Sequence, residues 1–151
     1  MPETKQPSHS PTGRIAWHCA CFNARKAARS VTRFYDHMLA PSGLKATQLT
    51  MLGAISISGA ATMSELAELL ALDKTTLTRN LRLLATAGLV AIDPGADRRA
   101  RIVALKPAGT YALERALPLW REAQRRVAEH LGEARWRRLI DDLAELESLG
   151  S

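Results

Sequence analysis

The sequence has few of the features that mark secreted, membrane-spanning or disulfide-stabilised proteins. It contains only two cysteines in 151 residues, so it has no disulfide framework, and a reducing cytoplasm is the expected location. No apolar run approaches the ~18 residues that a membrane span needs. The N-terminus has no apolar stretch of the kind found in a signal peptide. The length predicts a soluble chain with one domain, or two small lobes that share a core.

Motifs for catalysis are also missing. The four histidines, His9, His18, His37 and His130, fall in the N-terminal tail, on the first expected helix and at a helix end. No Ser–His–Asp order, phosphate-binding loop or carboxylate pair has a supporting context. The sequence therefore predicts neither an enzyme nor a bound cofactor.

Two cysteines and two histidines near the N-terminus are the candidate metal ligands. They are His18, Cys19, Cys21 and His37. A Cys-x-Cys pair on a continuous helix points its thiols apart, so one subunit cannot easily close a tetrahedral site. A site shared across a dimer is the alternative, but we expect no metal.

Positive charge is in excess and is concentrated in one segment. The net charge is +6, and residues 74–106 carry seven basic residues against two acidic ones. The basic residues of this segment are Lys74, Arg79, Arg82, Arg98, Arg99, Arg101 and Lys106. A basic cluster of this kind is typical of a nucleic-acid-binding face.

A long amphipathic helix is predicted near the N-terminus. Residues 1–13 hold three prolines and are interpreted as a flexible tail. The helix is expected to run from Arg14 to about Leu39, where the sequence APSG stops it. Its apolar residues recur in steps of four and three, which predicts one long packing face. They are Trp17, Cys21, Ala24, Ala28, Val31, Tyr35 and Met38.

Three shorter helices are expected next, with Thr47, Thr62 and Asp73 as their N-caps. Glu65 follows Thr62 by three residues and completes a capping box. Gly88 ends the third of these helices. Two short helices joined by a tight turn are the pattern of a helix-turn-helix.

The pattern then changes to a hairpin and two more helices. LVAI and RIVAL flank the turn sequence DPGADRRA, so residues 89–105 predict a β-hairpin. Pro107 suits the first position of a helix over 107–131, which Pro118 should bend or interrupt. A final helix is expected over 133–148.

The predicted fold class is therefore mainly α with a small β-hairpin. A winged helix-turn-helix at 46–105 is combined with a helical dimerisation lobe built from 14–40 and 107–148. Short hydroxyls and arginines on the fourth helix suit base edges and phosphates. These exposed positions are Thr75, Thr76, Thr78, Arg79 and Arg82. A winged-helix module that binds another protein is the alternative of a different class.

Two stretches, TLTRNLRLLATAGLV and DRRARIVALKPAG, resemble the MarR family of bacterial transcriptional regulators, and the flanking helices extend the resemblance over 14–148. Lys106 stands where the family usually has threonine. The resemblance implies a homodimer on a pseudo-palindromic double-stranded operator, usually as a repressor released by a small molecule, oxidant or metal. It also implies that Asp97 braces Arg99 in the minor groove, with Arg98 beside them.

The terminal helices support a dimer independently of that resemblance. The first helix and the two last helices, which bear Trp120 and Trp136, offer more apolar surface than a small wing can cover. An apolar patch of that size usually marks an interface.

The sequence is compatible with several signals that would control DNA binding. One hypothesis is an organic anion in the cleft between the dimerisation lobe and the winged helix, where the family that this sequence resembles commonly binds aromatic acids. Arg25, Arg29 and Arg33 recur every fourth residue and need a compensating charge, either from the acidic last helix or from a ligand. No effector at all is a further alternative. The expected pocket residues are Trp17, Cys21, Arg25, Met51 and Ile55.

Oxidation of a cysteine is another hypothesis. The helical seam buries Cys21 and places Cys19 about 200° away, so a bond between them would require the helix to unwind. The first helix also resembles that of the organic-hydroperoxide sensors of the family. That resemblance places Cys21 on their reactive cysteine and Tyr35 on one of two tyrosines that bond it. Ala46 occupies the second tyrosine position, and a buried, inert Cys21 is the alternative.

Overall fold

The computed structural model describes residues 11–96 and 100–150. It divides into two compact units, one that ends at Phe34 and one that begins at Tyr35. None of the helices in these ranges is long and apolar enough to span a membrane.

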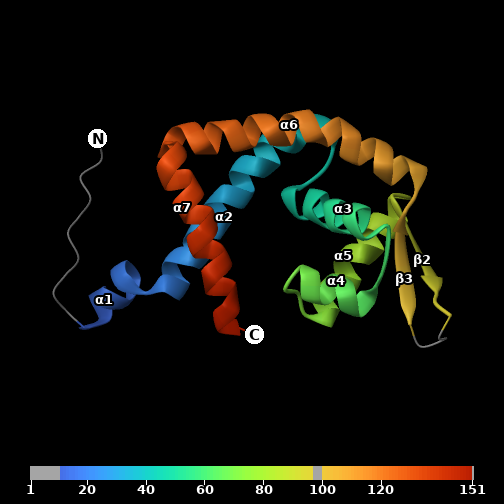
Figure 1. The fold of residues 1–151 in the computed structure, drawn as a ribbon, viewed down its shortest axis with the longest axis horizontal. Coiled ribbons are helices and arrows are strands. Elements are labelled where there is room, and N and C mark those ends of the chain that lie inside the picture. Colours follow the sequence, from blue (N-terminus) through green and yellow to red (C-terminus); the bar gives the residue numbers. More distant parts are fainter. Residues whose placement is uncertain (1–10, 97–99, 151) are drawn as a thin grey trace. The chain divides into compact units, whose positions relative to one another are not determined.

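The first unit contains α1 (Pro11–His18) and most of α2 (Ala20–Leu39), drawn in blue in Figure 1. The prediction of one continuous first helix is wrong, because the helix starts earlier, within the predicted tail, and is interrupted at Cys19. The Asn23 side-chain amide donates to the carbonyl of Cys19 at 3.0 Å and to that of Trp17 at 3.4 Å. An asparagine side chain competes in this way with backbone hydrogen bonds and favours a helix end.

The second unit is built around three helices and a small sheet. They are α3 (Ala46–Ser58), α4 (Met63–Leu69) and α5 (Lys74–Thr86). Their apolar faces meet in one core, which explains the spacing of leucine along α5. The largest fully buried side chains are Leu39, Leu52, Ile55, Leu66, Leu77, Leu81, Leu84 and Val103.

The sheet has three antiparallel strands in the order β1–β3–β2. The predicted hairpin is confirmed as β2 (Val90–Pro94) and β3 (Arg101–Leu105). The strand β1 (Ala60–Thr62) was not expected, because three residues carry no readable alternation. It forms through pairing with the opposite edge of β3, where Ala61 faces Val103.

Two of the predicted helix starts are confirmed. The Glu65 N–H donates to Thr62 Oγ1 at 3.2 Å and the Thr62 N–H donates to Glu65 Oε2 at 2.7 Å, which completes the capping box of α4. At α5, the Thr76 N–H donates to Asp73 Oδ1 at 2.9 Å. Gly88 follows α5 with φ of 73°, the left-handed conformation that suits glycine after a helix.

Thr47 is not an N-cap, since α3 begins at Ala46 and Lys45 is its N-cap. The Ala46 N–H donates to Asp36 Oδ1 at 2.7 Å, and the Lys45 N–H donates to Gln48 Oε1 at 2.9 Å. Carboxylate and amide oxygens thus replace the expected hydroxyl as acceptors.

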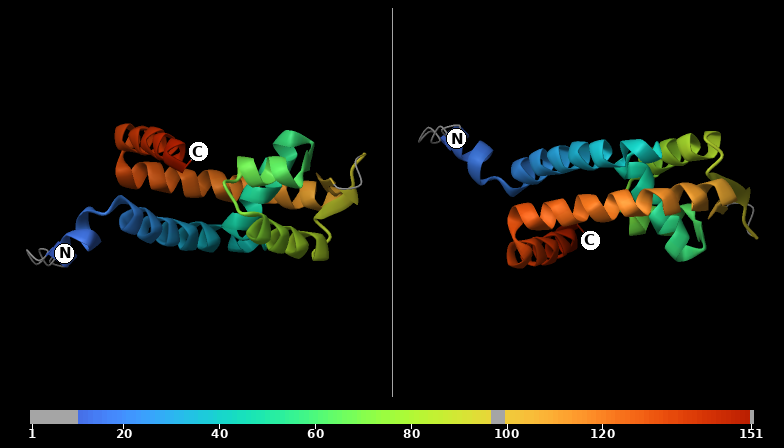
Figure 2. Two further views of the ribbon diagram at one scale, coloured as in Figure 1. Left: turned by 90° about the horizontal axis from the view of Figure 1, so that it is seen from below. Right: turned by 90° about the horizontal axis from the view of Figure 1, so that it is seen from above.

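Two long helices complete the second unit, α6 (Pro107–Leu131) and α7 (Glu133–Glu147). Pro107 occupies the start of α6 as predicted, and α6 continues through Pro118 without interruption. At Gly132, with φ of 83°, the chain turns sharply and α7 folds away from the end of α6 (Figures 1 and 2). Short 3-10 turns at Ala40–Ser42 and Ser148–Gly150 follow α2 and α7.

Gly109 fixes the junction between the wing and α6, and it provides a test of the packing there. A β-carbon at Gly109 would lie 2.0 Å from the carbonyl oxygen of Leu89. That oxygen also accepts the Lys106 N–H at 3.0 Å, so it cannot move freely. We expect Gly109→Ala to lower the free energy of unfolding in urea by ~1–3 kcal/mol, as overpacking does.

The matched control is Gly53→Ala in the middle of α3. A β-carbon there meets nothing within 4 Å. This change should raise stability by up to ~1 kcal/mol through helix propensity. If the two variants unfolded at the same midpoint concentration of urea, that result would contradict the close packing at Gly109.

Candidate nucleic-acid interface

A tight turn joins α4 to α5 and sets the direction of α5. Ala71 adopts φ of 49°, which is uncommon outside glycine. The Leu72 N–H donates to the Ala67 carbonyl at 2.9 Å, and Asp73 then caps α5. The two helices and the hairpin that follows them form a winged helix-turn-helix.

Five residues of α5 are predicted to contact DNA, and the structure divides them into two groups. The Thr76 hydroxyl donates to Asp73 Oδ2 at 2.6 Å, and the Thr78 hydroxyl donates to the Lys74 carbonyl at 2.7 Å. Both threonines are half-buried and help to hold the N-terminal turn. Thr75, Arg79 and Arg82 are exposed. The second group therefore supplies the side chains that are free to reach outward.

An open groove of about 570 Å³ follows this exposed face of α5. Among the described residues that line it, the charged side chains are all basic and the others are threonine and leucine. The opposite face of α5 carries the buried Leu77, Leu81 and Leu84. The lining residues of the groove are Lys74, Thr75, Thr78, Arg79, Arg82 and Leu83.

The predicted contacts at the wing tip, Asp97, Arg98 and Arg99, lie outside the described residues, so their roles stay predictions. The hairpin is closed just before that tip by the Gly95 N–H, which donates to the Ala100 carbonyl at 2.8 Å. The described part of the wing is therefore a paired ladder that continues as far as Gly95 and Ala100.

Two carboxylates cap the N-termini of α4 and α5. Hydrogen bonds from the Thr76 side chain and backbone lower the pKa of Asp73. Bonds from the Thr62 backbone and then its side chain lower the pKa of Glu65. Carboxylates whose pKa is lowered on folding stabilise the native state when ionised.

Asp73→Ala tests this cap. At pH 7, Asp73→Ala should unfold at a lower urea concentration than wild type. Asp73→Ser keeps an acceptor oxygen, so its midpoint concentration of urea should lie between those of Asp73→Ala and wild type. Because the folded pKa of Asp73 is lowered, its contribution is present above the unfolded value of about 3.9. This contribution should vanish as pH falls through the folded pKa. If the difference in free energy of unfolding between Asp73→Ala and wild type did not depend on pH, that result would contradict the ionic cap.

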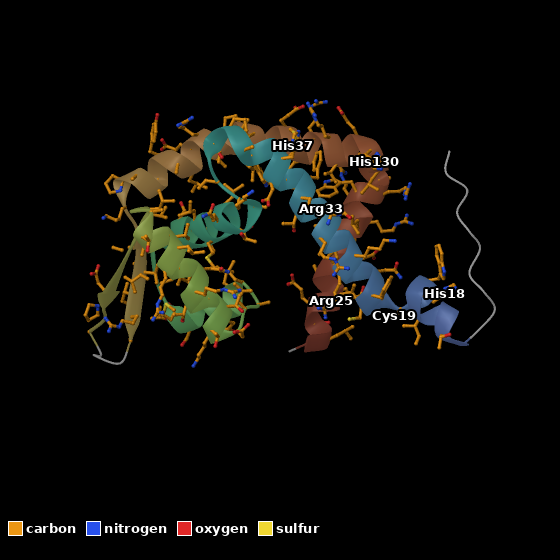
Figure 3. All side chains as sticks on the ribbon, turned by 180° about the vertical axis from the view of Figure 1, so that it is seen from behind. His18, Cys19, Arg25, Arg33, His37 and His130 are labelled. Atoms are coloured by element: carbon orange, nitrogen blue, oxygen red, sulfur yellow. The ribbon has the colours of Figure 1, made fainter. Side chains whose placement is uncertain are left out.

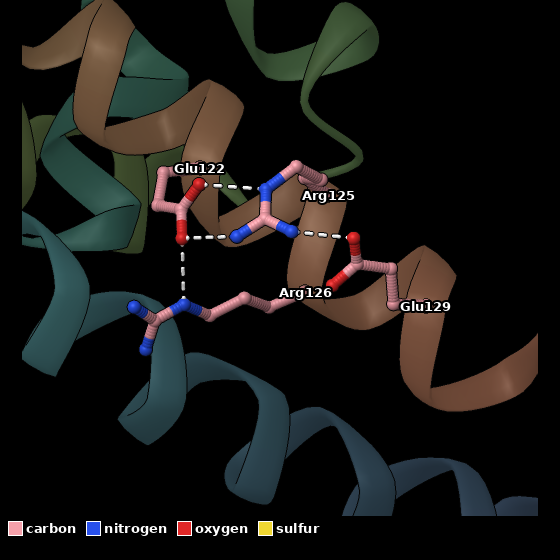
Figure 4. Close-up of polar contacts among 4 residues, drawn as sticks. All are labelled: Glu122, Arg125, Arg126 and Glu129. Carbon is pink, nitrogen blue, oxygen red and sulfur yellow. Dashed lines mark hydrogen bonds and ion pairs between the residues drawn. The ribbon is translucent and has the colours of Figure 1, made fainter.

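A second charged group lies on α6 (Figure 4). Glu122 accepts two hydrogen bonds from Arg125, at 2.7 and 2.8 Å, and one from Arg126 at 2.8 Å. Arg125 also bonds Glu129. These bonds, Arg125 first, lower the pKa of Glu122 to about 2. The side chains are one helical turn apart and partly exposed, so the group stabilises α6 rather than forming a binding site.

The residues of the predicted effector pocket come from both units. Trp17, Cys21 and Arg25 belong to the first unit and are exposed. Met51 and Ile55 belong to the second unit, and only 3% and 0% of their surfaces are exposed. Met51 borders a small cavity of about 130 Å³ beside Lys45 and α5. The pocket as a whole stays a prediction.

The two cysteines do not follow the helical seam as expected. Within the single chain Cys21 is exposed and Cys19 is half-buried, whereas the seam predicted a buried Cys21. The break at Cys19, labelled in Figure 3, removes the continuous helix on which that prediction depended. Tyr35, the predicted partner of Cys21, donates its hydroxyl to Gln124 Oε1 on α6, and burial raises its pKa.

Metal binding has no support among residues 11–96 and 100–150, where no cluster of three His, Cys, Asp or Glu side chains could hold an ion. His18 and His37 lie near the ends of different helices (Figure 3).

The winged helix-turn-helix fold can now be compared with known proteins. Residues 42–100 match the model of the MarR family. The transcriptional regulator MosR of M. tuberculosis, in complex with DNA, is 42% identical with a TM-score of 0.82, over 88% of this chain and 96% of that chain. A second MosR structure is 39% identical with a TM-score of 0.78, over 89% and 97%.

A mutant of MarR from E. coli, complexed with operator DNA, has the same fold at 22% identity, with a TM-score of 0.79 over 88% of this chain and 96% of that chain. A search of curated proteins found no match. The chain belongs to the MarR family of transcriptional regulators.

Proposed function

We propose that this protein is a homodimeric, sequence-specific DNA-binding repressor, released by a small effector such as an aromatic acid. The observation that carries the proposal is the exposed face of α5, where Thr75, Arg79 and Arg82 border a groove whose described lining residues include no acidic side chain. The DNA complex of MosR, a relative at 42% identity, supports the same function.

The chemistry of this face suits the major groove of DNA. An arginine donates two parallel hydrogen bonds to a guanine edge, and a threonine hydroxyl bonds a base or a phosphate. One short helix contacts few base pairs, so specificity requires two copies. A two-fold dimer reads two half-sites about one helical turn apart.

The terminal helices supply the surface for that dimer. No residue of α7 is buried in the single chain. Leu139, Ile140, Leu143 and Leu146 are 37–46% exposed and recur on one face of the helix. An apolar ridge on a helix with no buried residue is typical of an interface.

Selection from a random duplex library tests the function. The dimer should enrich a sequence with two-fold symmetry and half-sites spaced by about 10 base pairs. Failure to enrich any sequence over input would contradict sequence-specific binding. Reporter repression by the recovered site in cells would separate a repressor from an activator.

The effector proposal depends on the arginines of α2. Arg25 and Arg29 are exposed, and residues 11–34, the described part of their own unit, contain no acidic side chain. A ligand carboxylate would compensate this charge. A thermal-shift screen of aromatic acids tests the proposal, since a ligand of the native dimer raises its melting temperature.

Release by an oxidant is a second candidate, favoured by the exposure of Cys21 and by the break at Cys19. A hydroperoxide would oxidise the Cys21 thiolate to sulfenic acid and leave as the alcohol. Condensation with the Cys19 thiol would then form a disulfide and release water. Because the helix is already interrupted at Cys19, the bond does not require a regular helix to unwind.

Cys21→Ser is the test of that mechanism. The variant should bind DNA as wild type does but should no longer be released by hydroperoxide. Cys19→Ser separates a disulfide from a sulfenic acid, because only the disulfide requires both thiols. Release of the Cys21→Ser variant by peroxide, or no release of wild type, would remove the redox candidate.

A further inference from the structure

Another cavity lies beside this groove, where α5 faces the hairpin, with a volume of about 440 Å³. Its apolar lining includes Leu77 and Leu81 of the core, and the charged side chains among its described lining residues are three basic ones. It is lined by Met63, Lys74, Leu77, Thr78, Leu81, Arg82, Ile92 and Arg101.

The strand register explains why Arg101 borders this cavity. Ile92 pairs with Val103 and Pro94 pairs with Arg101. Side chains two residues apart share a face of the sheet, so Arg101 lies on the same face as the fully buried Val103. Asp93 pairs with Ile102 on the opposite face and does not line the cavity.

The three basic side chains that line this cavity have no acidic partner in the described chain. No carboxylate there lies within ion-pair distance of Lys74, Arg82 or Arg101. Asp73 is adjacent in sequence, but both of its oxygens are bonded to Thr76. Like charges around one cavity with an apolar floor repel each other, and an anion between them would remove that repulsion.

We infer that Lys74, Arg82 and Arg101 form a clamp for one backbone phosphate of DNA. This inference rests on the proposed function. Lys74, Thr78 and Arg82 line both this cavity and the groove on the outer face of α5, so the two share a wall. A DNA strand that passes along α5 would place one of its phosphates at the clamp while its nucleobases face Arg79.

The clamp would connect the recognition helix to the wing. Lys74 and Arg82 come from α5 and Arg101 comes from β3. Phosphate contacts of this kind carry no sequence information, but they fix the register and orientation of the protein on the duplex. Arg101 is thus a positioning residue rather than a reader of bases.

The experiment compares wild type with Arg101→Ala and Arg101→Gln in the full-length dimer, on the duplex selected above and on an unrelated duplex. Loss of one of the three cations of the clamp in each subunit should reduce the magnitude of the slope of log K against log salt by at most about 2. At ~0.1 M salt the affinity should fall on the order of tens of fold for both duplexes. Arg138→Ala, an exposed arginine of α7, is the control and should match wild type.

Neutral methylphosphonate, placed at one phosphate at a time, locates the contact. Wild type should lose affinity at one position in each half-site, and Arg101→Ala should lose less there, because only Lys74 and Arg82 remain to contact that phosphate. An unchanged salt slope for Arg101→Ala overturns the clamp alone. Benzoate or inorganic phosphate that stabilises wild type but not the variant, with equal DNA binding, also overturns it. Absence of duplex binding by wild type overturns the proposed function as well.

Discussion

Leu143→Asp in α7 is expected to dissociate the dimer and to remove measurable operator binding. Leu143 is 46% exposed in the single chain and lies on the apolar face of α7. Each copy loses ~2 kcal/mol of apolar burial and gains an unpaired carboxylate at the interface. Because the interface is two-fold, both effects occur twice, and the dimer constant should weaken by at least about a thousandfold.

Sedimentation equilibrium and circular dichroism test this prediction together. The variant should sediment as a monomer yet keep its helical content, since α7 contributes no buried residue to the core of the single chain. Leu143→Met preserves the apolar surface and should remain dimeric. A Leu143→Asp protein that stays dimeric and binds the operator normally would exclude this face from the interface.

Arg79→Ala is expected to cause the largest loss of sequence discrimination. Arg79 is exposed and lines the groove on α5 together with Thr75 and Thr78. A guanine contact by arginine is worth ~1–3 kcal/mol, and the dimer makes two such contacts. Specific affinity should therefore fall by a factor of about 30 to 20,000, with a smaller loss on unrelated duplexes.

Arg79→Lys is the matched control for charge. Lysine keeps the positive charge but lacks the planar fork, so it should retain non-specific binding and lose most of the discrimination. The quantity to measure is the ratio of specific to non-specific affinity at fixed salt. An equal loss for every duplex would assign Arg79 to a phosphate instead of a base.

The parts of the fold that could be predicted are those fixed by local chemistry. Asp73 and the Thr62–Glu65 pair cap their helices because their oxygens lie within reach of the first free N–H groups. Gly88 has the positive φ expected after a helix. The hairpin followed from alternation of apolar residues around a turn sequence.

Features that depend on distant contacts could not be predicted in the same way. The strand β1 exists only because Ala61 pairs with Val103, more than forty residues later. The start of α3 depends on Asp36, which belongs to α2. The break at Cys19 had a local signal in Asn23, but the seam of apolar residues across it favoured one helix.

The residues of the candidate site also differ in whether local sequence or distant contacts place them. Arg79 and Arg82 could be assigned from helical periodicity, because α5 is regular from its cap to its end. Lys74 and Arg101 were recognised only as part of the basic segment. Their common cavity depends on strand register, which places Arg101 on the face of Val103. The wing-tip residues and the effector pocket stay predictions.

The most direct test of the central claim is the salt dependence of binding to the selected duplex. If the dimer contacts six to ten phosphates, log K should fall with log salt at a slope on the order of −5 to −9. A flat response, with binding that does not depend on the duplex, would contradict the account. It would favour a winged-helix module that binds another protein.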